Sequence, residues 1–257
     1  MVKTSKREPL PVLFMWHHHQ PFYDSPDLER PMMPWVRLHA VRGYLDMIEA
    51  AHSCEAAVTF NFSPSLLEQL RFAAETNPAD EFERVSLIPA TDLTENDKRF
   101  ILTHFFSINW DVHIHPHPRF ADLLAKRGDR LDGESIKQAL IEYSAQDYTD
   151  LIVLFNLAWI GFTGRKDHHI KALFNKGTDY SFQDIQFVLG YHHEVLKRII
   201  PRYSELYNRD LIGISASPYS HAILPLLCDT RSAAPDIPAQ ELPHPAYCRA
   251  GDSDPQL

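Results

Sequence analysis

Three consecutive histidines follow a short apolar run near the start of the chain. The run is Val12–Met15, and the histidines are His17, His18 and His19. Alternate side chains of a β-strand point to the same face, so His17 and His19 would project together and His18 the other way. At the carboxyl end of a parallel strand, that face commonly opens into an active site. Neutral imidazoles beside the amide of Gln20 can donate and accept hydrogen bonds, which suits sugar hydroxyls.

The same spacing also suits a pair of metal ligands. A similar pattern recurs at His113–His117, where Pro116 indicates a surface loop. A His-x-His pair at the end of a first strand is also the opening feature of amidohydrolase-type metal hydrolases. Those enzymes need further histidines and an aspartate on later strands, which have no evident place here. A metal-dependent hydrolase built on His17 and His19 stays open as an alternative.

Polar and aromatic residues also follow the other predicted strands. Asn61 lies where a strand gives way to a helix that Ser63 or Ser65 could cap. Trp159 ends another apolar run, where an indole could stack on a sugar ring or pack in the core. His221 lies in a turn after the last predicted strand. We count Asn61, Trp159 and His221 with the histidine pair and Gln20 as candidate ligand-binding residues.

The elements that must position these residues indicate an α/β fold. The predicted buried strands are Val12–His19, Ala56–Ser63, Leu151–Trp159 and Leu211–Ser217. Each is apolar along its length, as expected for a parallel sheet that is covered on both faces. Only about four strands can be counted, which is roughly half of the eight in a standard (β/α) barrel.

Helical patterns separate the predicted strands. Residues 64–148 form a long helical excursion, and the clearest helix spans Phe182–Tyr207. Ser181 and Asp184 resemble a capping box at its start, and Pro201 should kink it. Prolines crowd the last 23 residues or so, which predicts an irregular tail over 231–257 after a domain at 1–230.

Composition restricts the partners. The 257 residues carry a formal charge of −9 and no Lys/Arg-rich block, which argues against nucleic acid and an anionic membrane. No run reaches the ~18 to 20 apolar residues of a membrane span, and no cleavage site follows the first apolar run, so we predict a cytoplasmic protein. The cysteines are odd in number and far apart, which indicates neither disulfides nor a structural zinc site; they are Cys54, Cys228 and Cys248.

Five motifs together resemble the N-terminal part of glycoside hydrolase family 57. In chain order, they are Trp16-His17-x-His19-Gln20-Pro21, Pro34-Trp35-Val36-Arg37-Leu38-His39-Ala40, Thr59–Leu67, Phe155-Asn156-Leu157-Ala158-Trp159 and Ser217-Pro218-Tyr219-x-His221 with the following Ile223–Leu227. The resemblance implies part of a (β/α)7 barrel and retaining cleavage or transfer of α-glucosidic bonds in α-glucans or maltooligosaccharides. It implies no cofactor and no metal. His17 and His19 become substrate-binding residues near the cleaved bond, and His221 a further lining residue.

The sequence departs from this family in its carboxylates. A retaining mechanism needs two carboxyl groups about 5 to 5.5 Å apart. In the family, the glutamate nucleophile and aspartate acid/base follow the Pro-Tyr-x-His segment on later strands, so we expect an N-terminal portion that lacks both. No catalytic residue is assigned, and the family's Gly-x-x-Glu motif has only Gly213. We expect an inactive chain alone, with self-association through an open barrel edge; a non-catalytic glucan-binding protein is the alternative.

Overall fold

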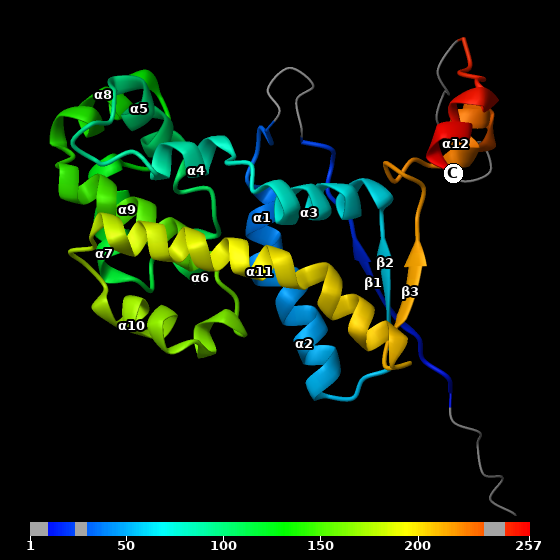
Figure 1. The fold of residues 1–257 in the computed structure, drawn as a ribbon. Coiled ribbons are helices and arrows are strands. Elements are labelled where there is room, and N and C mark those ends of the chain that lie inside the picture. Colours follow the sequence, from blue (N-terminus) through cyan, green and yellow to red (C-terminus); the bar gives the residue numbers. More distant parts are fainter. Residues whose placement is uncertain (1–9, 24–29, 234–244) are drawn as a thin grey trace, which may run out of the picture.

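The computed structural model describes residues 10–23, 30–233 and 245–257. It is a helix-rich α/β structure with a small parallel sheet (Figure 1). The strands, in spatial order, are β1 Phe14–His18, β2 Val58–Phe62 and β3 Gly213–Ala216. Three of the four predicted strands are thus confirmed with trimmed ends. The described residues form an open sheet and close no barrel.

The register of the sheet separates its two faces. His17 pairs with Asn61, which pairs with Ser215, and these three residues share one face. The opposite face carries Trp16, His18, Phe60 and Phe62, and the long helix α11 (Phe182–Asn208) packs on it through Tyr203. The ring of Tyr203 lies 5.0 Å from that of Phe60 and 5.1 Å from that of Phe62. Apolar burial therefore fixes which way the polar face points.

The predicted strand Leu151–Trp159 is wrong. Residues Ala145–Ala158 form helix α9, which begins at a capping box between Ser144 and Asp147. Every side chain from Leu151 to Ala158 is buried, so this part of the helix is enclosed on all sides, and all of these residues except Asn156 are apolar. Such a run carries neither a period of 3.6 nor one of 2, and its apolar content alone cannot distinguish a buried helix from a buried strand.

The other helices follow the predicted order. Between β1 and β2 lie α1 Trp35–His39, the π-helical turn Ala40–Tyr44 and α2 Leu45–Ser53. The helical excursion over 64–148 is confirmed, and α11 begins at the predicted capping box and runs through Pro201. The remaining helices are α3 Pro64–Thr76, α4 Glu81–Ser86, α5 Glu95–His104, α6 Trp110–His113, α7 Pro118–Arg127, α8 Gly133–Glu142, α10 His168–Lys176 and α12 Leu224–Cys228, with 3-10 turns at Gly164–Lys166, Thr230–Ala233, Ala250–Asp252 and Asp254–Gln256.

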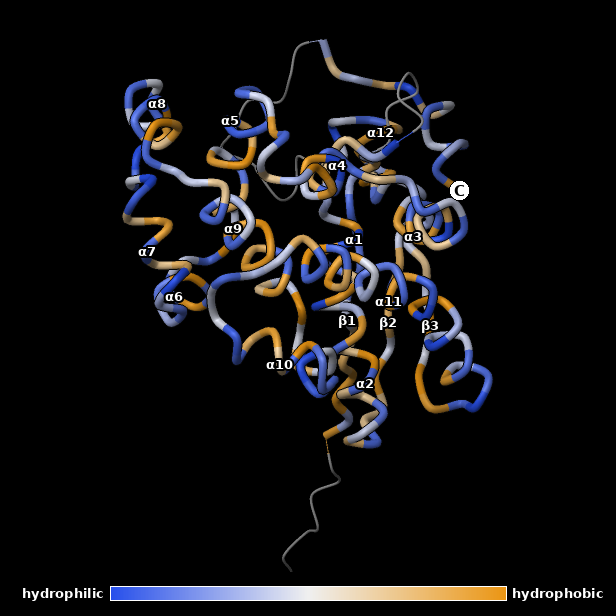
Figure 2. The backbone as a smooth tube through the Cα atoms, turned by 60° about the vertical axis from the view of Figure 1, so that its left-hand side comes forward, coloured by the Kyte–Doolittle hydropathy of each residue, from blue (hydrophilic) through white to orange (hydrophobic). Residues whose placement is uncertain are grey.

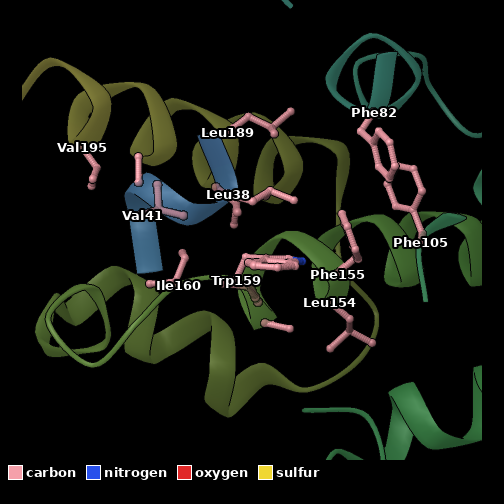
Figure 3. Close-up of a cluster of buried hydrophobic side chains, with 14 of the residues drawn as sticks. Leu38, Val41, Phe82, Phe105, Leu154, Phe155, Trp159, Ile160, Leu189 and Val195 are labelled. Atoms are coloured by element: carbon pink, nitrogen blue, oxygen red, sulfur yellow. The ribbon is translucent and has the colours of Figure 1, made fainter. Parts of the chain in front are cut away.

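The largest part of the core lies between helices rather than on the sheet. Side chains from α1 and its π-helical extension, α9 and α11 meet there (Figure 3). Leu38, Phe105, Phe155 and Ile160 are fully buried in this cluster. Along outer helices such as α7 and α8, hydrophobic and hydrophilic residues alternate, as expected for helices with one buried face (Figure 2). Because α11 contacts both this cluster and the sheet, it ties the two parts together (Figure 1).

A buried ionic network also joins these helices. The Arg37 guanidinium on α1 donates to Asp80 at 2.8 Å and to Nδ1 of His192 on α11 at 2.8 Å. Its Nη1 also donates to Asn156 on α9 at 3.3 Å. All four side chains are buried, so removal of one partner would leave the others without compensation.

The described C-terminal residues pack against the segment after β3. Tyr247 accepts a backbone hydrogen bond from Thr230, and Arg249 donates one to Leu227 of α12 (Figure 1). Tyr219 donates its backbone N–H to Gln256. The predicted boundary near residue 230 stays a prediction, as does self-association through the sheet edges. None of the described helices is long and apolar enough to cross a membrane.

Candidate functional site

The polar face of the sheet carries a hydrogen-bonded row across all three strands. Asn61 on β2 donates from Nδ2 to the hydroxyl of Ser215 on β3 at 2.9 Å. Its Oδ1 must then be the acceptor for Nδ1–H of His17 on β1, at 2.6 Å. A neutral His17 with its proton on Nδ1 leaves Nε2 as an acceptor. Among the described residues, nothing hydrogen bonds to that Nε2.

The hydrogen bonds of His19 favour the opposite tautomer from that of His17. Its Nδ1 lies 2.8 Å from the hydroxyl oxygen of Ser63, which accepts a hydrogen bond from Ser65. Ser63 is fully buried, so its own hydroxyl proton has to be used, and Nδ1 of His19 is the acceptor within reach. A neutral His19 therefore carries its proton on Nε2. His17 offers an acceptor and His19 a donor, the pair that one hydroxyl group can satisfy.

His221 lies beside these two imidazoles and completes a cluster of three. Its ring centroid lies 4.2 Å from that of His17 and 5.1 Å from that of His19. It has a φ of 61° in the turn after β3, where its backbone N–H donates to Pro218. Burial, and then the nearby His221 and His17, lower the pKa of His19. These effects favour the neutral form that the hydrogen bonds require.

His18 is structural. Its side chain is 2 % exposed and lies among Tyr44, Phe60, Phe62 and Tyr203. The Tyr203 hydroxyl donates to the carbonyl of Tyr44, so it accepts from Nε2–H of His18 at 2.9 Å. Burial lowers the pKa of His18 to about 4. The predicted division of the three histidines between two faces is confirmed.

Gln20 and Trp159 lie together, but on a different cavity from the histidine cluster. Both line a cavity of about 750 Å³. Gln20 donates to the hydroxyl of Tyr44 and accepts from that of Tyr23. Trp159 follows the end of helix α9, not of a strand, and is 8 % exposed against the Leu38 and Val41 segment (Figure 3). Trp159 therefore follows a helix and not the predicted strand, and its mostly buried indole agrees with the core alternative that the sequence left open.

Ser63 and Ser215 hydrogen bond to His19 and Asn61, and the sequence reasoning missed both contacts. Ser63 occupies the N-cap position of α3 as predicted, yet its side chain makes no capping hydrogen bond and supports His19 instead. Ser215 lies two residues after Gly213 and shares the register of Asn61 and His17. Strand alternation could have identified Ser215, whereas only the tertiary contact shows what Ser63 does.

The histidine cluster does not have the spacing of a metal site. In the part of the chain that the structure describes, one set of three ligand groups has donor atoms within 4.8 Å of one another, and it is Asp167, His168 and His169. The carboxylate of Asp167 there accepts from the backbone N–H groups of His169 and Ile170 as a helix cap. The cluster of His17, His19 and His221 is not such a set.

The predicted surface loop at His113–His117 holds only in part. His113 ends helix α6 and lines the 750 Å³ cavity. His115 is exposed beside Asp111, and His117 precedes helix α7. Burial, followed by the charges of Arg42 and Arg165, lowers the pKa of His113 to about 4.

Two acidic residues of the C-terminal segment have partners other than the histidines. Asp229 pairs with Arg231, and Asp252 accepts from the hydroxyl of Tyr247. Among the described residues, no Asp or Glu side chain makes a hydrogen bond or ion pair with the three clustered histidines. Two further acidic residues of the C-terminal segment, Asp236 and Glu241, lie outside the described residues.

Fold and site together define a class: an α/β protein with a polar binding face at the carboxyl ends of parallel strands. The family model of glycosyl hydrolase family 57 matches residues 13–242, and the chain belongs to this family. Comparison with curated proteins finds no match, and comparison with solved structures finds none either. Family membership supports a glycoside hydrolase or a related transferase with a carbohydrate substrate.

Proposed function

We propose that the histidine cluster binds an α-glucan chain or maltooligosaccharide in a retaining hydrolase or transferase. The observation that carries the proposal is the complementary state of two neighbouring imidazoles. His17 offers a free Nε2 acceptor and His19 a free Nε2–H donor. A sugar hydroxyl is both donor and acceptor, so it can satisfy the two together.

The supporting residues hold these two imidazoles in place before a ligand arrives. Asn61 and Ser63 fix the ring orientations, and the Asn61 amide is itself bonded to Ser215 on the next strand. Little side-chain entropy then remains to be lost on binding. His221 covers one side of the pair, and its side chain makes no hydrogen bond within the described chain, so it can contact a second hydroxyl.

Isothermal titration with maltoheptaose tests this proposal. We expect saturable binding that His19→Ala weakens at least about tenfold, because the buried hydroxyl donor of Ser63 and a ligand hydroxyl both lose their partner. His115→Ala is the matched control, since His115 lies exposed on the surface. Asn61→Ala should weaken binding less than His19→Ala, because it removes only the support of His17. Unchanged affinity in the His19 variant would refute the proposal.

The catalytic step is a separate part of the proposal. We assign none of the described carboxylates as nucleophile or acid/base, because none makes a hydrogen bond or ion pair with the histidines. We therefore expect no release of reducing sugar from amylose or pullulan by this chain alone. Robust turnover would overturn that assignment while leaving the binding site intact.

A non-catalytic glucan-binding role is the second candidate, favoured by the same observation that no described carboxylate makes a hydrogen bond or ion pair with the cluster. Addition of a polypeptide carrying the family's later strands separates the two. Restored turnover supports the enzyme, and continued binding without turnover supports the binding protein. Stoichiometric zinc in protein purified in metal-free buffer, lost in His17→Ala, would instead revive the metal-dependent alternative.

A further inference from the structure

The 750 Å³ cavity has a composition of its own. It lies between the α1 segment with its π-helical extension, Gln20 and Tyr23 on one side, and residues 107–113 before and within α6 on the other. Its walls hold Trp35, Trp159, His39 and His113, with Arg42 as the charged member. Among its described lining residues there is no Asp or Glu, although the chain as a whole is acidic, with a formal charge of −9.

Arg42 has no anionic partner among the described residues. Its guanidinium lies 5.8 Å from the ring centroid of Trp159, and within the described parts of the chain its side chain makes neither an ion pair nor a hydrogen bond. Arg84, Arg119 and Arg202, by contrast, are each paired with carboxylates. Arg42 is partly buried. Its donors are thus withdrawn from part of their water without protein acceptors to replace it.

The charge of Arg42 reaches the two histidines of the cavity. Burial and then Arg42 lower the pKa of His39, and Arg42 is the first charge after burial to lower that of His113. Both effects need a positive potential in the cavity. An anion bound in the cavity would offset this positive potential.

The aromatic residues supply the rest of a recognition surface. The rings of Trp35 and Trp159 lie 5.9 Å apart at 55°, and His39 packs edge-on against Trp159 at 5.3 Å. Indoles stack on the apolar faces of sugar rings while amides contact their hydroxyls. Ser107, Asn109 and Gln20 provide such polar groups at the rim.

We propose that this cavity binds a phosphorylated hexose, with the sugar ring against the Trp35 and Trp159 wall and the phosphate at Arg42. A neutral sugar would leave the Arg42 guanidinium unpaired, and a bare phosphate would leave the aromatic wall unused. The phosphorylated hexose can be a free hexose phosphate or a phosphorylated residue at the end of a glucan. This site is distinct from the histidine cluster and goes beyond the proposed function.

Titration calorimetry with glucose 6-phosphate, glucose and inorganic phosphate tests the site. We expect glucose 6-phosphate to bind at least about tenfold more tightly than either of the other two, because only it contacts both the aromatic wall and Arg42. Arg42→Gln should reduce that affinity at least about tenfold, and Arg71→Gln, on the exposed surface of α3, should not change it. Glucose or inorganic phosphate binding as tightly as glucose 6-phosphate would overturn the proposal.

A second variant keeps the test valid if Arg42→Gln does not fold. Val112 is 60 % exposed at the cavity, so Val112→Asp should fold and should repel the phosphate. Unchanged glucose 6-phosphate affinity in both variants would also overturn the proposal. Tighter binding of glucose 6-phosphate than of maltoheptaose phosphorylated on a terminal residue supports a free hexose phosphate, and the reverse supports a glucan end.

The same measurements can refute the two proposed sites independently of each other. Arg42→Gln should leave the affinity for unphosphorylated maltoheptaose unchanged, and His19→Ala should leave that for glucose 6-phosphate unchanged. Loss of maltoheptaose binding in His19→Ala with no detectable glucose 6-phosphate binding would refute only the cavity. Glucose 6-phosphate binding that Arg42→Gln abolishes, without maltoheptaose binding, would refute only the histidine site.

Discussion

Replacement of His18 by glutamine should remove a defined part of the pH dependence of stability. His18 is buried and neutral in the folded chain, where burial lowers its pKa to about 4 from the ordinary 6.5. Glutamine keeps an N–H donor that can reach the Tyr203 hydroxyl but cannot take up a proton. The wild-type chain must lose stability as pH falls, because unfolding lets His18 bind a proton that the folded site excludes.

The magnitude follows from the two pKa values. Above pH 6.5 the histidine is neutral in both states and contributes no pH dependence. As pH falls from 6.5 towards 4, the unfolded state gains a proton that the folded state does not. With pKa values of 6.5 and about 4, the loss between pH 7 and pH 5 is about 2 kcal/mol of unfolding free energy.

Urea titrations of the wild type and His18→Gln at pH 7 and pH 5 measure this difference. Other buried histidines, such as His192, contribute to both proteins and cancel in the comparison. If His18→Gln loses as much stability as the wild type between the two pH values, the assignment of His18 as a buried neutral group is refuted.

Three further predictions concern the helices that carry the sites. Arg37→Leu should cost about 3 to 5 kcal/mol of unfolding free energy, because buried Asp80 would lose its partner; chemical denaturation measures this, and a loss under 1 kcal/mol would contradict it. Ser144→Ala should cost about 1 kcal/mol by removing the cap of α9, with an unchanged urea midpoint as the contrary result. Gly161→Ala should lower the thermal midpoint, because its Cβ would lie 2.9 Å from the carbonyl oxygen of Arg42 and collide with the Asp46 carboxylate; an unchanged midpoint would argue against this packing.

The strands at the sheet could be predicted because each is a short apolar run that ends in polar residues. Val58–Phe62 and Gly213–Ala216 were found this way, together with Asn61 and the alternation of His17 and His19. The start of α11 was also predictable, since the Ser181 and Asp184 capping box is a local signal. Local hydrogen bonds and a period of two are properties of neighbouring residues, so the sequence alone contains them.

The helix α9 could not be separated from a strand by its apolar content. The apolar run Leu151–Ala158 is buried on every side, so no amphipathic period remains in it. The capping box at Ser144 lies before this run and therefore does not mark the run itself as helical. The position of Trp159 then followed the wrong element. A continuous apolar run indicates a buried segment but does not indicate whether it is a helix or a strand. That choice depends on the helices that pack around it.

The sequence by itself determined the family motifs, the parallel strands and the alternation of the three histidines between two faces. The tertiary structure alone decided the state of each histidine. Asn61 sets the tautomer of His17, buried Ser63 that of His19, and Tyr203 that of His18, and none of these partners is adjacent in sequence. Among the described residues, it also leaves Arg42 without an ion pair or hydrogen bond, beside Trp159. Proton positions and unpaired charges depend on contacts between distant residues, which local sequence patterns do not encode.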